Sequence, residues 1–225
     1  MISTEAKESV VALCRGLIGA QSLSGHEEPA VSLLADAFCK LGYDHVQTDR
    51  YGSVTGTIQG DRPGPHILLD AHIDVVPVDG ESDWQHPPFG GEVAKGKLFG
   101  RGASDMKGAL AAMTIAAAEF ARETERGFAG SVTVSAVVCE ELFEGLGARM
   151  VCERIQPDYV VIGEASEMNL KIGQRGRAEV VVETTGVPAH SANPQKGVNA
   201  VTSMRKLLDA IDAIVPGQKV HATGY

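Results

Sequence analysis

The chain has 225 residues, of which 44% are hydrophobic and 22% are charged, and this composition argues against disorder as its main theme. Its formal net charge of −9 and its sequence pI near 5.2 argue against a nucleic-acid-binding or membrane-binding surface, because such surfaces need clustered lysine and arginine. We therefore expect a small molecule or a peptide as the partner, and neither nucleic acid nor a membrane.

Two amphipathic helices are predicted at the start of the chain. Apolar residues recur at helical spacing over residues 10–18, and the first helix is expected to end near Gly19. Ser24 and Glu27 have the spacing of a capping box, which predicts a second helix that stops at Gly42. A helix pair of this kind usually covers a sheet.

Strands and helices alternate in the middle of the chain. Strands are predicted at Val54–Ile58, Ile67–Ala71, Val132–Val138 and Tyr159–Ile162. Helices are predicted at Lys107–Arg122 and Leu146–Ile155. This alternation predicts an α/β fold with a largely buried, at least partly parallel sheet.

The character of the sequence changes after Gly176. Residues 178–185 alternate like a half-exposed strand, and residues 198–214 show the pattern of an amphipathic helix. We therefore expect a domain boundary at this point, with residues 1–175 in the first domain and residues 176–225 in the second.

The cysteines and the N-terminus indicate a reducing compartment. The four cysteines lie in apolar stretches without the paired spacing of a zinc ribbon, so we predict reduced core residues. Residues 1–17 carry charges among apolar residues and lack the basic start and continuous apolar core of a signal peptide. No later segment is apolar for the length of a membrane span. We predict a cytoplasmic protein.

Histidine and carboxylate residues follow three predicted strands at their carboxyl ends. These residues are His72, Asp74, Glu140, Glu141 and Glu164. Asp105 lies immediately before a predicted helix and can reach the same edge of the sheet. Because ligands of open α/β sheets bind outside the carboxyl ends of the strands, we expect these side chains to form one site.

One imidazole with several carboxylates suits zinc or a similar divalent ion. His72 and Asp74 lie two residues apart, so on an extended backbone Asp74 can hold the second imidazole nitrogen. Glu140 and Glu141 point to opposite sides if they are extended, so one can bind metal while the other transfers protons. Taken alone, a histidine after a strand is more often a hydrogen-bonded surface or core residue, and a pair of glutamates is more often a solvated surface. Together they favour a functional site. Neighbouring carboxylates repel one another, so the ends of a buried sheet would have no reason to gather several of them for solubility alone.

The chain resembles the di-zinc family that includes acetylornithine deacetylase, succinyl-diaminopimelate desuccinylase, aminoacylases and several dipeptidases and carboxypeptidases. The matching segments, in the family's order, are His72–Pro77, Trp84–Phe89, Gly100–Gly108, Glu140–Glu141 and Ile162–Ala165. The resemblance implies a zinc exopeptidase-like catalytic domain over residues 1–175, with a mixed, mostly parallel sheet sandwiched by helices. It also implies that residues 176–225 begin a smaller α+β lid domain, through which the full-length protein forms a homodimer.

The resemblance implies a role for each site residue. The metal ligands would be His72, Asp105, Glu141 and Glu164, with Asp105 bridging two zinc ions. Asp74 would orient His72, Glu140 would be the general base, and His190 would help hold the substrate carbonyl. The peptide bond between Asp105 and Met106 would be cis.

Two features of the chain depart from the family pattern. Ala71 replaces the glycine that usually precedes the histidine, a small change that we expect to be tolerated. The chain reaches Tyr225 without the family's closing catalytic segment and its distal histidine ligand, so we expect it to be the front part of a longer enzyme. His221 has the wrong context for a replacement ligand.

The implied activity is hydrolysis of an amide bond in an N-acyl amino acid or a short peptide. Two zinc ions would activate the attacking water, Co²⁺ or Mn²⁺ could replace zinc, and Glu140 would serve as the base. Two alternatives stay open. The chain could be a truncated, catalytically inactive fragment, or it could be a non-enzymatic binding or dimerisation module of the same fold.

Overall fold

The structure is a computed structural model that describes residues 3–174 and 176–214. The chain divides into two units, Met1–Leu170 and Lys171–Tyr225, and each unit is described by itself. The predicted boundary residue Arg175 and His221 lie outside the described residues.

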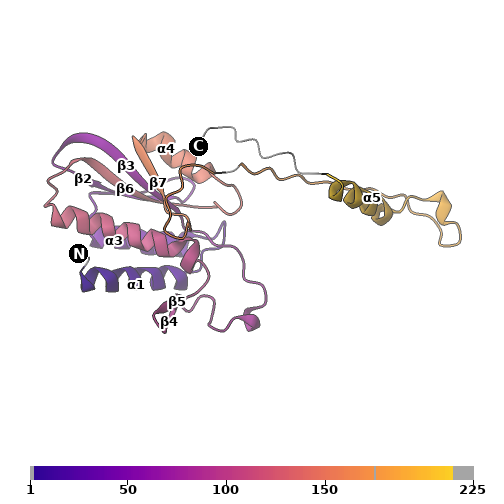
Figure 1. The fold of residues 1–225 in the computed structure, drawn as a ribbon, viewed down its shortest axis with the longest axis horizontal. Helices are drawn as coiled ribbons and strands as arrows, with labels where there is room; N and C mark the ends of the chain where they lie inside the picture. The colour runs from indigo at the N-terminus through magenta and orange to yellow at the C-terminus, as the bar shows by residue number, and fades with distance from the viewer. Residues whose placement is uncertain (1–2, 175, 215–225) are drawn as a thin grey trace. The chain divides into compact units, whose positions relative to one another are not determined.

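The first unit is built on a five-stranded sheet with the strand order β1-β2-β6-β3-β7 (Figure 1). The strands are β1 (His45–Thr48), β2 (Val54–Gln59), β3 (Arg62–His72), β6 (Ala129–Val137) and β7 (Tyr159–Ile162). Strand β3 runs parallel to both β6 and β7, whereas β2 runs antiparallel to β1 and to β6. The predicted mixed α/β sheet is therefore confirmed, and the carboxyl ends of its three parallel strands lie at one edge.

Helices cover both faces of this sheet (Figure 1). The helices are α1 (Thr4–Gly19), α2 (Glu28–Lys40), α3 (Gly108–Glu123) and α4 (Leu146–Ile155). The first three share a large apolar core with one sheet face, and Val151 of α4 packs with Leu68 and Val137 on the other. The predicted sandwich is confirmed. In the part of the chain that the structure describes, no helix is long and apolar enough to cross a membrane.

Three short strands were not predicted from the sequence. Strand β1 pairs with β2 at the edge of the main sheet, and β4 (Glu92–Ala94) and β5 (Lys97–Phe99) form a separate antiparallel pair. All three have mostly exposed or half-buried side chains, so they carry little of the apolar alternation that marks a strand.

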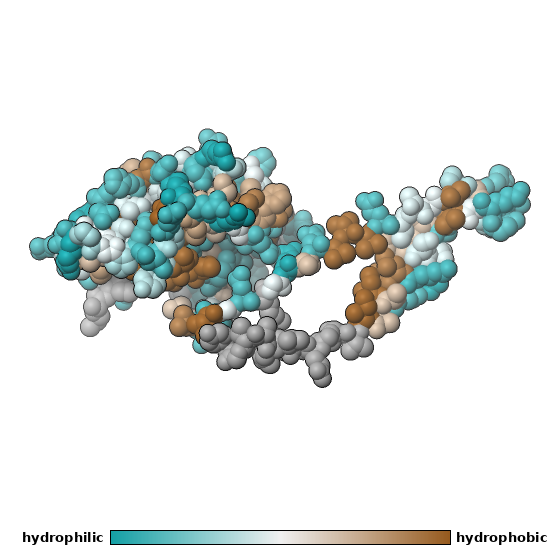
Figure 2. Space-filling model, turned by 90° about the horizontal axis from the view of Figure 1, so that it is seen from above, coloured by the Kyte–Doolittle hydropathy of each residue, from teal (hydrophilic) through white to brown (hydrophobic). Residues whose placement is uncertain are grey.

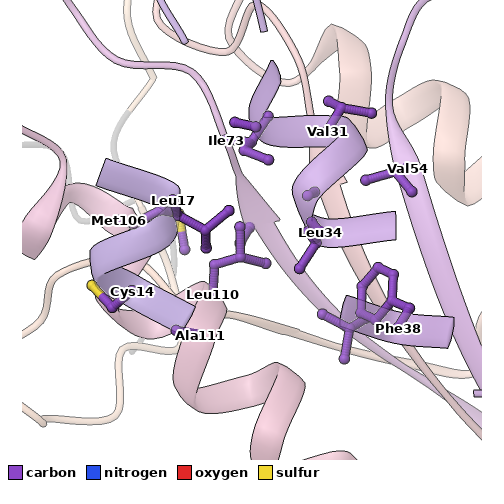
Figure 3. Close-up of a cluster of buried hydrophobic side chains, with 14 of the residues drawn as sticks. Cys14, Leu17, Val31, Leu34, Phe38, Val54, Ile73, Met106, Leu110 and Ala111 are labelled. Carbon is purple, nitrogen blue, oxygen red and sulfur yellow. The ribbon is translucent and has the colours of Figure 1, made fainter. Parts of the chain in front are cut away.

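The core beneath β2 contains the side chain of Phe38 (Figure 3), which closely approaches Gly56. Phe38 is fully buried, and its ring centroid lies 4.6 Å from that of Tyr43. A Cβ atom at Gly56 would lie 2.6 Å from the Phe38 ring, so only glycine leaves room for the ring on the sheet.

The predicted capping box at the start of α2 is wrong. Glu27 itself occupies the N-cap position, and no side chain caps the helix. The Ser24 hydroxyl instead donates to Asp74, and the Glu27 carboxylate accepts from the N–H of Cys139. Partners that are distant in the sequence have replaced the local cap.

The described part of the second unit contains helix α5 (Ala200–Asp212), whose first turn is capped by the side chain of Asn199. Val187 and Val198 form an isolated antiparallel bridge that closes the loop between them. The strand predicted over residues 178–185 is not formed. An alternating pattern requires a neighbouring strand to complete its hydrogen bonds, and the described residues offer none here.

The cysteines are free, as predicted, but they are not all core residues. Cys14 is buried, and Cys139 and Cys152 are half-buried. Cys39 is exposed near the end of α2, so its predicted place in the core is wrong because that part of the helix surface faces solvent.

Substitution of Gly56 by alanine should destabilise the first unit through the contact with Phe38. Inserting a methyl group into a filled core costs about 1–3 kcal/mol in the free energy of unfolding. Urea unfolding of Gly56→Ala, Phe38→Leu and the double variant measures the coupling. The double variant should lose less stability than the sum of the single losses, whereas additive losses would contradict the contact.

Candidate metal centre

The predicted site residues of the first unit lie where the three parallel strands end. His72 is the last residue of β3, Glu140 and Glu141 follow β6 closely, and Glu164 follows β7. Asp105 lies in the turn Ala103–Lys107 that leads into α3. These residues come from four separate segments, and the parallel pairing of the strands explains why they meet.

His72, Asp105 and Glu141 offer a compact group of ligand atoms. One atom from each residue lies within 4.8 Å of the other two. The His72 ring is buried, whereas Asp105 is exposed and Glu141 is half-buried. Among residues 3–174 and 176–214, this is the one cluster of three histidine, cysteine or acidic residues with such spacing.

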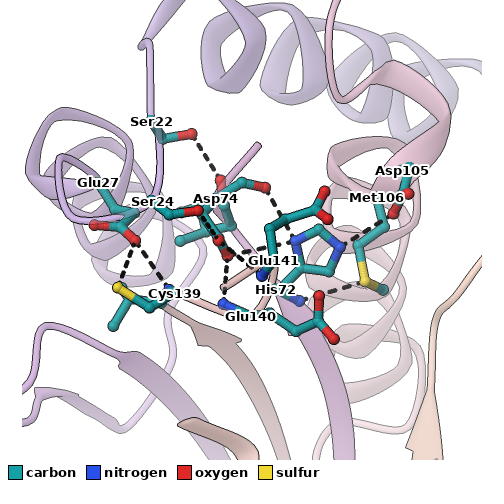
Figure 4. A network of polar contacts seen from close by, with 12 residues as sticks. Ser22, Ser24, Glu27, His72, Asp74, Asp105, Met106, Cys139, Glu140 and Glu141 are labelled. Carbon is teal, nitrogen blue, oxygen red and sulfur yellow. Dashed lines mark hydrogen bonds and ion pairs between the residues drawn. The ribbon is translucent and has the colours of Figure 1, made fainter. Parts of the chain in front are cut away.

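Hydrogen bonds fix the orientation of the His72 ring (Figure 4). Its Nδ1 atom lies 3.0 Å from the main-chain oxygen of Asp74, which can only accept, so Nδ1 carries a proton. Its Nε2 atom faces Asp105 Oδ1 at 3.1 Å and Glu164 Oε1 at 3.6 Å. In the neutral ring, the Nε2 lone pair therefore points toward two carboxylates.

Asp74 is fully buried and holds more than the imidazole. Its carboxylate accepts the Ser24 hydroxyl at 2.6 Å and the N–H groups of Glu140 and Glu141 at 3.0 and 3.1 Å. The carboxylate is 3.5 Å from His72 Nδ1, farther than the main-chain oxygen of the same residue. Burial raises the pKa of Asp74, but the interaction with His72 and the hydrogen bonds from Ser24 and the two N–H groups hold it below its usual value.

The turn that carries Asp105 is anchored on both sides. The peptide bond between Asp105 and Met106 is cis, as predicted. The sulfur of Met106 accepts the N–H of His72 at 3.3 Å. The buried Lys107 ammonium donates to the main-chain oxygens of Leu17 at 2.6 Å and Ala20 at 3.3 Å. Asp105 thus sits between contacts to β3 and to the end of α1.

The charges of the site fit a cation. Burial lowers the pKa of His72, but the hydrogen bonds with Asp74 and Asp105 and the charge of Glu164 raise it to about 9. Burial raises the pKa of Glu140, Glu141 and Glu164, and neighbouring carboxylates raise each of them further. A proton on Nε2 relieves this repulsion, and a divalent ion between the same atoms would do so with more charge.

The structure brings together six of the seven predicted site residues, all in the first unit. The seventh, His190, belongs to the second unit. Its Nδ1 atom accepts the N–H of Ala192 at 3.1 Å, so the neutral ring carries its proton on Nε2.

Four residues that support the site were not predicted from the sequence: Ser24, Glu27, Met106 and Lys107. A charged residue at the start of an alanine-rich helix was a usable signal for Lys107, because a lysine next to apolar residues must find partners. The spacing of Ser24 and Glu27 indicated a helix cap instead.

Comparison with known proteins identifies relatives of about twice the length. The profile of peptidase family M20/M25/M40 matches residues 68–223. The chain is 32% identical over 210 residues to succinyl-diaminopimelate desuccinylase 2 of Ruegeria sp., a match that covers 88% of this chain and 53% of that protein. The chain thus spans about half the length of the curated relatives it matches.

Solved structures share the fold. The M20 family metallo-carboxypeptidase Sso-CP2 from Sulfolobus solfataricus superposes with a TM-score of 0.66 at 19% identity, over 99% of this chain and 53% of that chain. The YXEP protein of Bacillus subtilis, described as a dinuclear metal binding peptidase, gives a TM-score of 0.53 at 20% identity, over 68% of this chain and 40% of that chain. At these identities, the likeness shows the fold alone.

His72 should make the metal-free protein less stable as the pH rises. Its pKa of about 9 lies above the ordinary histidine value of 6.5, so its stabilisation is complete below the lower value and is lost as the pH rises through the higher one. Because one pKa unit corresponds to about 1.4 kcal/mol, we expect a loss of about 3 kcal/mol that His72→Gln does not show. Urea unfolding with a chelator across this pH range measures it.

Lys107 is an internal control for this measurement. Burial lowers its pKa to about 8, so its contribution makes the protein more stable as the pH rises, and it does so in both proteins. The wild-type profile should therefore fall relative to that of His72→Gln. Parallel profiles would contradict the electrostatics described for His72.

Proposed function

The chain belongs to peptidase family M20/M25/M40, and from this premise we propose that its protein is a metal-dependent hydrolase of amide bonds. The substrate would be an N-acyl amino acid or a short peptide. The observation that carries the proposal is the group of His72, Asp105 and Glu141 at the ends of parallel strands. The names of the curated relatives, succinyl-diaminopimelate desuccinylases, support removal of an acyl group from an amine.

We propose that the metal is zinc, with two ions in a complete site and Co²⁺ or Mn²⁺ as possible replacements. The residues that would hold it are His72, Asp105, Glu141 and Glu164. Bound zinc would supply a Lewis acid for the amide carbonyl and would make water a nucleophile near neutral pH. The orientation of His72 Nε2 toward two carboxylates supports this ligand set.

Glu140 is proposed as the general base. It would take a proton from the attacking water and return it to the leaving amine. Burial raises the pKa of Glu140, which brings a carboxylate closer to the pH at which it can both accept and release a proton. Its N–H is held by Asp74, so its backbone position is defined.

His190 is proposed to donate a hydrogen bond to the substrate carbonyl as negative charge develops on its oxygen. The N–H of Ala192 occupies the Nδ1 atom, which leaves an Nε2–H group available for this purpose. This role requires no change in the charge of the ring.

The domain assignment and the cellular setting are also proposals. Residues 1–175 would form the catalytic domain and residues 176–225 part of a lid, through which the full-length protein would form a homodimer. The exposed apolar residues of α5, which are Val201, Leu208 and Ile211, support a contact surface on this unit. Apolar residues are visible on the surface of this unit in Figure 2. We propose a cytoplasmic location, as the free cysteines and the absence of a spanning helix in the described residues are compatible with it.

Zinc binding by the 225-residue chain tests the proposed site. After saturation with zinc and gel filtration, the wild type should retain the metal and His72→Ala should not, since that substitution removes the one imidazole of the cluster. Elemental analysis measures the zinc content. His45→Ala is a matched control, because His45 is exposed on β1, and it should retain zinc like the wild type. Zinc-free wild type would favour an inactive chain or a binding module.

Glu140→Gln tests the assignment of the base. In a form of the protein that turns over substrate, the change should lower kcat by about 100-fold or more, because an amide cannot accept the proton. Zinc content should stay at the wild-type level, since Glu140 is not among the proposed ligands. A variant that keeps its activity would rule out Glu140 as the base.

A further inference from the structure

We propose that Ser24 and Glu27 are positioning residues that hold the backbone of Cys139–Glu141 and thereby set the directions of Glu140 and Glu141. The proposal rests on the proposed function, which makes Glu140 the base and Glu141 a metal ligand. Both residues lie in the segment between α1 and α2, which contributes none of the proposed metal ligands.

The first connection runs through Asp74 (Figure 4). The Ser24 hydroxyl donates to Asp74 Oδ2 at 2.6 Å. The same carboxylate accepts the N–H groups of Glu140 and Glu141. Hydrogen bonds to an ionised carboxylate are stronger than those between neutral groups, so Ser24 helps to hold an acceptor on which both glutamates depend.

The second connection runs directly from Glu27 to Cys139. Glu27 Oε1 accepts the N–H of Cys139 at 2.9 Å and lies 3.4 Å from its sulfur. Glu27 is only 6% exposed, and burial of a carboxylate is costly unless it is hydrogen-bonded. Cys139 has a φ angle of +56°, a left-handed conformation that is costly for a residue with a side chain. The bond to Glu27 holds the chain in this conformation.

The two connections bind three consecutive N–H groups. The N–H groups of Cys139, Glu140 and Glu141 all donate to buried carboxylates, the first to Glu27 and the other two to Asp74. Three fixed amides in succession leave the backbone little freedom. The side chains of Glu140 and Glu141 therefore leave the chain in defined directions.

The segment that supplies Ser24 and Glu27 is itself fixed to the end of β3. The Ser22 hydroxyl donates to the main-chain oxygen of Ile73 at 2.7 Å, and the N–H of Val75 donates to that of Ser22 at 2.9 Å. Leu23 and Val75 form a parallel bridge. These contacts give the support a rigid base.

Amide hydrogen exchange in the metal-free chain tests the proposal. In Glu27→Leu, exchange of the Cys139 amide should accelerate about tenfold, as expected for the loss of one hydrogen bond. In Ser24→Ala, the amides of Glu140 and Glu141 should exchange faster. NMR resolves these amides individually, and unfolding in urea gives the global stability against which each rate is compared.

Matched controls separate positioning from general destabilisation. Glu28→Leu and Ser32→Ala change exposed residues of α2 and should leave the three amides protected. Glu27→Gln keeps an acceptor oxygen and should retain most of the protection. If Glu27→Leu fails to fold, Ser24→Ala tests the same turn through the amides of Glu140 and Glu141. The proposal is overturned if the three amides exchange no faster in Ser24→Ala and Glu27→Leu than in these controls at equal global stability.

A Co²⁺ titration of the same variants gives the second readout. Loss of a supporting contact behind a metal ligand lowers metal affinity about 10- to 100-fold, so Ser24→Ala should bind Co²⁺ more weakly than Ser32→Ala. The exchange experiment contains no metal, so its result stands even if the wild type fails to bind Co²⁺. Failure of the proposed function and failure of the positioning role are thus told apart.

Discussion

The site depends on one constraint, which is that the carboxylate of Asp74 is completely buried. A buried carboxylate remains charged only when hydrogen bonds replace the water it has lost. The Ser24 hydroxyl and the N–H groups of Glu140 and Glu141 supply those bonds. Satisfying one charge therefore draws the loop before α2 and the turn after β6 to the end of β3, where the other site residues are.

The electrostatics of the cluster follow from this arrangement. Asp74 fixes a proton on His72 Nδ1, so the opposite ring nitrogen must interact with whatever lies between the carboxylates of Asp105 and Glu164. With a proton there, the imidazole carries one positive charge against several carboxylates whose pKa values are already raised. The surplus of negative charge is a reason for the cluster to bind a divalent ion.

Much of this arrangement could be predicted from the sequence. The strands could be recognised as apolar runs. The acidic residues that follow them could be assigned to one site, because parallel strands place their carboxyl ends together. The partners of Ser24 and Glu27 were not visible, since they lie 50 and 112 positions away, and a capping box has the same spacing. The strand predicted over residues 178–185 is not formed. An alternating pattern does not indicate whether a neighbouring strand is present to pair with it.

The two units contribute differently to the proposed chemistry. All the proposed metal ligands and the base lie in the first unit, where hydrogen bonds with Asp74 hold the ring of His72 and the backbone of Glu140 and Glu141. The second unit contributes His190, whose tautomer is set by the N–H of Ala192 two residues away. Each part of the proposed centre is thus organised within its own unit.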